Sequence, residues 1–130
     1  MKFNLNINKV ASDMLQASAS SLVKGGEQAS EYASHEYAQF IEDIEHVQTM
    51  ADQGTISAAE AQALVDQYKM SMQAVLLCIE GLGVIAVQNA INAALQVLNG
   101  AITAALGTAV KGLKFHLWIL MTHHNHWWFR

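Results

Sequence analysis

The stretch DQGTISAAEAQAL, residues 52–64, carries the clearest local structural signal in the sequence. Gly54 is the residue type that most often follows the end of a helix, because glycine readily adopts the left-handed backbone conformation needed there. Ser57 and Glu60 have the spacing of a capping box, in which each side chain accepts a hydrogen bond from the backbone N–H of the other. The stretch therefore predicts one helix ending near Asp52 and another beginning after Ser57. The loop between them is short enough to make the two helices antiparallel.

Apolar residues on both sides of this stretch recur at helical spacing. The preceding helix, predicted from Glu27 to about Asp52, carries one narrow row with spacings of four and three, as in a helical hairpin or coiled coil. This row consists of Ala33, Tyr37, Phe40, Ile44, Val47 and Ala51. The facing row of the following helix is expected to consist of Leu64, Tyr68, Met72, Val75, Ile79 and Leu82. Together the rows predict a helical hairpin.

A weaker helix is predicted before the hairpin, over residues 8–23. Its segment ASASS makes it marginal in isolation, and the following Gly25–Gly26 pair ends it. The chain has 130 residues, no proline and much alanine, which favours one domain of long helices. We therefore predict an all-α fold, an antiparallel helical hairpin or small helical bundle. Within this single domain, residues 1–26 form the weak helix and turn, 27–110 the hairpin, and 111–130 a basic tail rich in histidine and tryptophan.

Residues 81–110 contain no charged side chain and predict a long chargeless central helix. Gly81 and Gly83 allow two interpretations, a kink in this helix or the close approach of another backbone. One face of the helix is large and apolar, a second carries amides and a third is nearly all small. The predicted oligomer interface combines the first two faces: Val84, Val87, Gln88, Ile91, Asn92, Leu95, Gln96, Leu98, Asn99, Ile102 and Leu106. Because a surface helix normally shows charges on one side, we expect protein or lipid to surround this one.

The charge of the chain is low and unevenly placed. Charged residues make up 14% of the chain and apolar residues 52%, so burial against another surface is expected. All 11 acids lie in the first 80 residues, against four lysines, whereas Lys111, Lys114 and Arg130 make the tail basic. Three tail cations without a basic stripe give no support for nucleic-acid binding. The single cysteine, Cys78, has no partner for an internal disulfide and is expected to be buried.

The tail offers two further interpretations. Lysines and tryptophans gather at membrane interfaces, and the candidates here are Lys111, Lys114, Trp118, Trp127 and Trp128. The chargeless stretch would measure roughly 45 Å as a helix, more than a hydrocarbon core of about 30 Å. A lipid-facing helix would have to desolvate its amides, however, so these demand a partner helix. The cluster of His123, His124 and His126 has a composition that binds transition metals.

No catalytic motif is found, and we expect neither an enzyme nor a bound cofactor. Glu31, His35, Glu42 and His46 share one side of the second helix, opposite its apolar row, and are expected to be solvated. The N-terminal residues lack the apolar core of a cleavable signal, which leaves cytoplasmic, membrane-associated or signal-independent exported locations.

The function we expect is self-association, with the 81–110 helix as the interface of a structural homo-oligomer. A membrane-inserting helical oligomer is the alternative, and metal binding by the tail a third option. In composition the chain is similar to secreted filament subunits and to small pore-forming or holin-like proteins.

Overall fold

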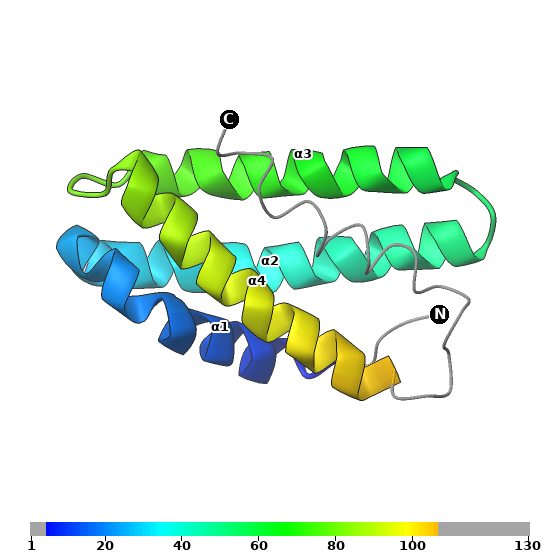
Figure 1. Ribbon diagram of the computed structural model, residues 1–130, viewed down its shortest axis with the longest axis horizontal. Helices are drawn as coiled ribbons and strands as arrows, with labels where there is room; N and C mark the ends of the chain where they lie inside the picture. Colours follow the sequence, from blue (N-terminus) through cyan, green and yellow to red (C-terminus); the bar gives the residue numbers. More distant parts are fainter. Residues whose placement is uncertain (1–4, 107–130) are drawn as a thin grey trace.

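A computed structural model of the chain describes residues 5–106, which form an all-α bundle, as the sequence predicts (Figure 1). Its elements are α1 (Ile7–Leu22), a short 3₁₀ turn η1 (Val23–Gly25), α2 (Gly26–Asp52), α3 (Ala58–Leu77) and α4 (Val84–Leu106). The helices α2 and α3 lie side by side, and α4 crosses obliquely from the far end of α3 to α1 (Figure 1).

The turn between α2 and α3 has the predicted structure. The backbone N–H of Glu60 donates to Ser57 Oγ at 3.1 Å, and the backbone N–H of Ser57 donates to Glu60 Oε1 at 2.8 Å. Gly54 follows the end of α2 with a φ of 74°, in the left-handed region that glycine tolerates. Both helix boundaries at this turn are therefore confirmed, since Asp52 ends α2 and α3 begins directly after Ser57.

The buried row of α2 agrees with the prediction, whereas that of α3 does not. On α2, Ala33, Tyr37, Phe40, Ile44 and Val47 of the predicted row are buried, whereas Ala51 is half-buried. On α3 the buried residues are Ala61, Val65, Lys69, Met72 and Leu76. Of the predicted row, Leu64, Tyr68 and Val75 are only half-buried, and Ile79 and Leu82 are buried beyond the end of α3. The prediction was therefore right for Met72 and wrong for the other residues on α3, because the buried row contains Lys69, which an apolar pattern excludes.

Helix α1 agrees closely with the predicted helix and contacts α2 through a polar side chain. The side chain of Asn6 caps it by accepting a hydrogen bond from the backbone N–H of Lys9 at 3.2 Å. Ser18, in the serine-rich segment, donates to the carbonyl of Met14 at 3.0 Å and accepts from the hydroxyl of Tyr37 at 2.9 Å. Burial raises the pKa of Tyr37 to about 12, although the Ser18 hydrogen bond lowers it. A buried tyrosine hydroxyl thereby finds a partner.

The turn before α4 explains the glycines of the chargeless stretch. Helix α3 ends at Leu77 and α4 begins at Val84, so two separate helices replace the kinked helix that one interpretation expected. Cys78, which was expected to be buried, is exposed. Gly81 has a φ of 94°, and a Cβ atom on it would collide with the backbone carbonyl of Lys24. The expected close approach of another backbone therefore occurs, between this turn and the turn that joins α1 to α2.

Helix α4 packs chiefly against α1, in the most extensive contact between any two helices of the bundle (Figure 1). Its inward side carries large apolar residues together with two alanines: Val87, Ala90, Ile91, Ala94, Leu95, Leu98 and Ile102, all buried. The buried side of α1 likewise includes small residues, Ala11 and Ser18. Small side chains let two helix backbones approach closely, which gives α1 a packing role that its sparse apolar content conceals.

Candidate self-association surface

The outward side of α4 is exposed and carries no charged residue. Six of the exposed residues of α4, which we call its outward face, share this side: Ile85, Asn89, Gln96, Gly100, Thr103 and Ala104. At 1.5 Å per residue this face runs about 30 Å along the helix. A solvent-exposed helix side of this length ordinarily carries lysine or glutamate. The outward face offers only amide, hydroxyl, methyl and bare backbone groups to whatever contacts it.

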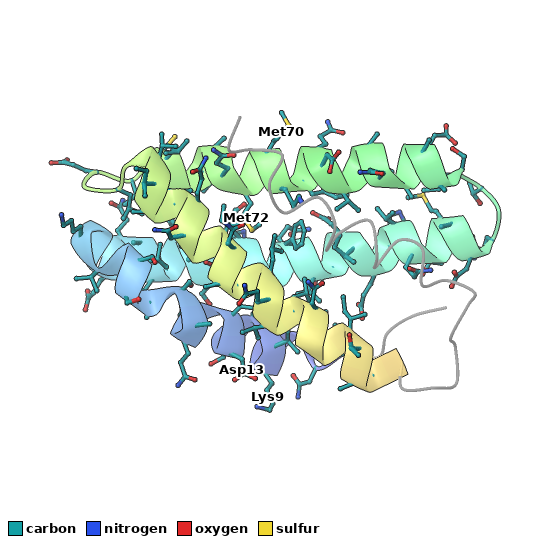
Figure 2. The ribbon with its side chains drawn as sticks, viewed as in Figure 1. Lys9, Asp13, Met70 and Met72 are labelled. Atoms are coloured by element: carbon teal, nitrogen blue, oxygen red, sulfur yellow. The ribbon has the colours of Figure 1, made fainter. Side chains whose placement is uncertain are left out.

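The neighbouring surface of α1 is also nearly uncharged. Its two charged residues, Lys9 and Asp13, form an ion pair with each other at 3.2 Å and project from the edge of the bundle (Figure 2). The other exposed residues of α1 are small or carry amides and hydroxyls: Asn8, Ser12, Gln16, Ala17, Ala19 and Ser20. A hollow lined by Ser20, Ser21, Lys24, Ile85, Ala86 and Asn89 lies where the two helices meet. The low-charge surface therefore spans both helices, with the lysine Lys24 at the end where α4 begins.

Gly100 lies towards the C-terminal end of the outward face, inside a regular helix. A Cβ atom built on it would meet nothing within 4 Å, so no packing inside the chain requires a glycine here. Glycine in a helix interior costs about 1 kcal/mol relative to alanine. A close contact from outside the chain would give this glycine a role.

The amide row predicted on α4 divides between inside and outside. Gln88 is buried, Asn92 and Asn99 are half-buried, and Gln96 is exposed. The Oδ1 atom of Asn92 is itself buried and accepts no hydrogen bond from the part of the chain that the structure describes. A buried carbonyl oxygen without a donor is costly, so this amide favours a further partner.

The large apolar residues of the predicted interface do not lie on the exposed side of α4, where contact with a second copy would require them. Val87, Ile91, Leu95, Leu98 and Ile102 are buried within the chain itself, while Val84 is 52% exposed at the start of α4 and Leu106 ends the helix. A second copy would have to open the bundle to contact the five buried residues. The surface that α4 leaves accessible is the outward face, and of the predicted interface residues the exposed ones are Val84 and Gln96.

Lys69 is the chemically notable residue that the sequence analysis missed. It lies on α3 among apolar residues and is fully buried. Burial lowers its pKa to about 8, against the opposing effect of the nearby Asp66 carboxylate. The available signal was its spacing, because Lys69 falls four residues after Val65 and three before Met72.

The remaining candidate residues lie on an exposed side of α2 or outside the described residues. Glu31, His35, Glu42 and His46 are exposed, as expected of a solvated side. Within residues 5–106 no three histidine, cysteine or acidic side chains are placed to hold a metal ion. The predicted metal residues His123, His124 and His126 and the membrane-interface residues Lys111, Lys114, Trp118, Trp127 and Trp128 lie outside the described residues. None of the described helices is long and apolar enough to cross a membrane.

Comparison of the chain with protein-family models, with curated proteins and with solved structures found no match.

Proposed function

We propose that this protein is a non-enzymatic, self-associating helical subunit whose copies contact one another through the outward face of α4. One observation carries the proposal: a side of α4 about 30 Å long is exposed and has no charged residue. Most of the acids lie on α2 and α3; the acid on α1, Asp13, is paired with Lys9, and Glu80 lies in the turn before α4. Two copies of the outward face could therefore meet without burying an unpaired charge.

The chemistry of the face suits contact with an identical face. The side-chain amides of Asn89 and Gln96 each donate and accept, so either can pair with an amide of an identical face across a two-fold axis. Gly100 and its small neighbours allow the two backbones to approach closely. A contact of one face with the same face closes a pair. Growth into a ring or filament requires a second, different surface.

A charge placed in the outward face tests the proposal. In the variant Gln96→Glu, two copies would bring carboxylates together at the centre of the contact, and we expect association to weaken at least tenfold. The matched control is Gln67→Glu, which makes the same change on an exposed residue of α3. Sedimentation velocity of the full chain over a range of concentrations gives the dissociation constant for each protein.

A second variant separates association from helix stability. Gly100→Ala should stabilise the monomer by about 1 kcal/mol, because alanine is the better helix former. It should nevertheless weaken association, since the added methyl group separates the two backbones. A parent chain that remains monomeric at high concentration would contradict the proposal, as would equal association by all three variants.

The same preparations test the membrane alternative. Release of a dye from lipid vesicles by the full chain, together with a monomeric state in water, would favour a membrane-inserting oligomer over a soluble assembly.

A further inference from the structure

A groove runs between α2 and α3, on a surface distinct from the outward face of α4. It has a volume of about 340 Å³. Its floor comes from both helices and is mainly aromatic and apolar: Phe40, Tyr68, Met72 and Val75. In Figure 2, Met72 lies between the two helices, whereas Met70 of the same helix points away from them. We call this feature the α2–α3 groove.

Two carboxylates border the groove on its α2 side. Glu36 and Asp43 are seven residues apart, so they lie on the same side of the helix two turns from each other. Glu36 is half-buried, and burial raises its pKa. His35 lowers this pKa and Asp43 raises it. A cation entering the groove would therefore stabilise the Glu36 carboxylate, which burial and the neighbouring Asp43 disfavour.

A second hollow of about 370 Å³ continues the groove towards the start of α2. It shares Glu36 and Val75 with the groove and adds an exposed aromatic residue, Tyr32. The combined surface has aromatic and apolar residues from both helices, and its α2 side carries three acids together with His35: Glu31, Glu36 and Asp43. This surface suits an extended peptide that carries both aromatic and basic side chains.

The chain contains such a peptide. Residues 111–130 have three cations, no acid and all three tryptophans of the protein. We propose that residues 111–130 dock in the α2–α3 groove of their own chain, with aromatic side chains on its floor and lysines beside Glu36 and Asp43.

The length of the chain permits this contact. An extended chain spans about 3.3 Å per residue, whereas α2, with 27 residues, is about 40 Å long. Fully extended, the 24 residues that follow Leu106 would span about 80 Å, so the tryptophans can reach any point on the bundle, whereas Lys111 and Lys114, five and eight residues after Leu106, reach about 17 and 26 Å. Tethering gives the segment an effective concentration on the order of millimolar, which favours the groove of its own chain over that of a neighbour.

The location of the tryptophans provides the experiment. Because residues 5–106 contain none, tryptophan fluorescence of the full chain reports only on the segment in question. We expect acrylamide to quench the wild-type protein several-fold less than it quenches free tryptophan. The variant Glu36→Lys/Asp43→Lys should increase quenching at least twofold, because it repels the lysines of the segment. High salt should change the wild type in the same direction, because it screens the attraction.

The matched control reverses two acids away from the groove. Glu42→Lys/Glu80→Lys changes the net charge equally at two exposed residues and should leave quenching as in the wild type. If the groove variant fails to fold, as judged by circular dichroism, the neutral variant Glu36→Gln/Asp43→Asn replaces it. Equal quenching of groove and control variants, or wild-type tryptophans as accessible as free tryptophan, would overturn the proposal. Quenching that falls with rising protein concentration would overturn docking within one chain and indicate a neighbour's segment.

Discussion

The bundle has two halves that hold together by different means. The α2–α3 hairpin carries most of the described charge, has a capped turn and buries one lysine. The α1–α4 pair has a single ion pair, buries small residues, and leaves an uncharged side exposed. The charged surface of the hairpin is suited to contact with water. The exposed side of the α1–α4 pair lacks charged residues, although contact with water alone would favour them there. This difference is why we assign self-association to α4 and not to the hairpin.

The two halves meet at glycines as well as through the core. The turn around Gly81 contacts the backbone of Lys24, and a Cβ atom on Gly25 would lie 3.1 Å from both Ile79 Cγ2 and Leu82 Cγ. Each turn thus fits against the other only because neither side carries a side chain at these points. The end of the bundle where α4 begins is therefore fixed by backbone contact.

The largest effect is expected from Gly81→Ala, which breaks this junction. The substitution forces alanine to a φ of 94° and places its methyl group on the Lys24 carbonyl. Left-handed strain and overpacking together should cost roughly 4 kcal/mol, measured as the free energy of unfolding in urea. Gly54→Ala is the control, because its φ is also positive, at 74°, but nothing lies within 4 Å of the added atom.

The control should lose only about 1–2 kcal/mol, from strain alone. If Gly81→Ala costs no more than Gly54→Ala, the contact between the two turns does not stabilise the bundle, and the halves would be joined through the core alone.

The same division explains what the sequence predicted. The hairpin turn was predictable because Gly54, Ser57 and Glu60 act within a few residues of one another. The packing of α4 on α1 was not, because it joins residues about 80 positions apart through alanines and serines, which form no amphipathic pattern. The sequence therefore predicted that a second copy covers the large apolar side of α4, whereas in the structure α1 of the same chain covers it. Gly81 was noted as a place for close approach, but its partner, Lys24, could be found only in three dimensions.

A smaller effect, on the hairpin alone, is expected from Lys69→Met. Folding lowers the pKa of Lys69 from 10.5 to about 8, so between these values the unfolded chain holds a proton that the folded chain does not. Raising the pH then favours the folded state, by up to about 1.4 kcal/mol per pH unit. From pH 8 to 10 the wild type should gain roughly 2 kcal/mol in urea unfolding, and Lys69→Met should lose this gain.

The control is Lys24→Met, an exposed lysine whose removal should leave the rise in place. Measurements stop at pH 10 because Tyr37 acts in the opposite direction above it. Its pKa is raised from 10 to about 12 by burial, so the unfolded chain releases that proton first and stability falls. A wild type with a flat profile between pH 8 and 10 would mean that folding does not lower the lysine pKa.

The smallest effect is expected from Ser57→Ala, which removes the most local signal in the molecule. The substitution leaves the backbone N–H of Glu60 without its side-chain acceptor and should cost about 1 kcal/mol. Ser30→Ala, on an exposed residue within α2, is the control and should be neutral or slightly stabilising. A stability change indistinguishable from that of Ser30→Ala would show that the cap contributes nothing to the hairpin.

Hydrogen exchange on the same variant sharpens the comparison between the halves. If the hairpin and the α1–α4 pair open separately, Ser57→Ala should speed exchange in the first turns of α3 and leave the amides of α4 protected as before. If the contact at Gly81 makes them one cooperative unit, amides that exchange only through global unfolding should lose the same free energy in both halves. The second result is the one we expect, because α1 packs against both α2 and α4 and the two turns interlock at backbone level.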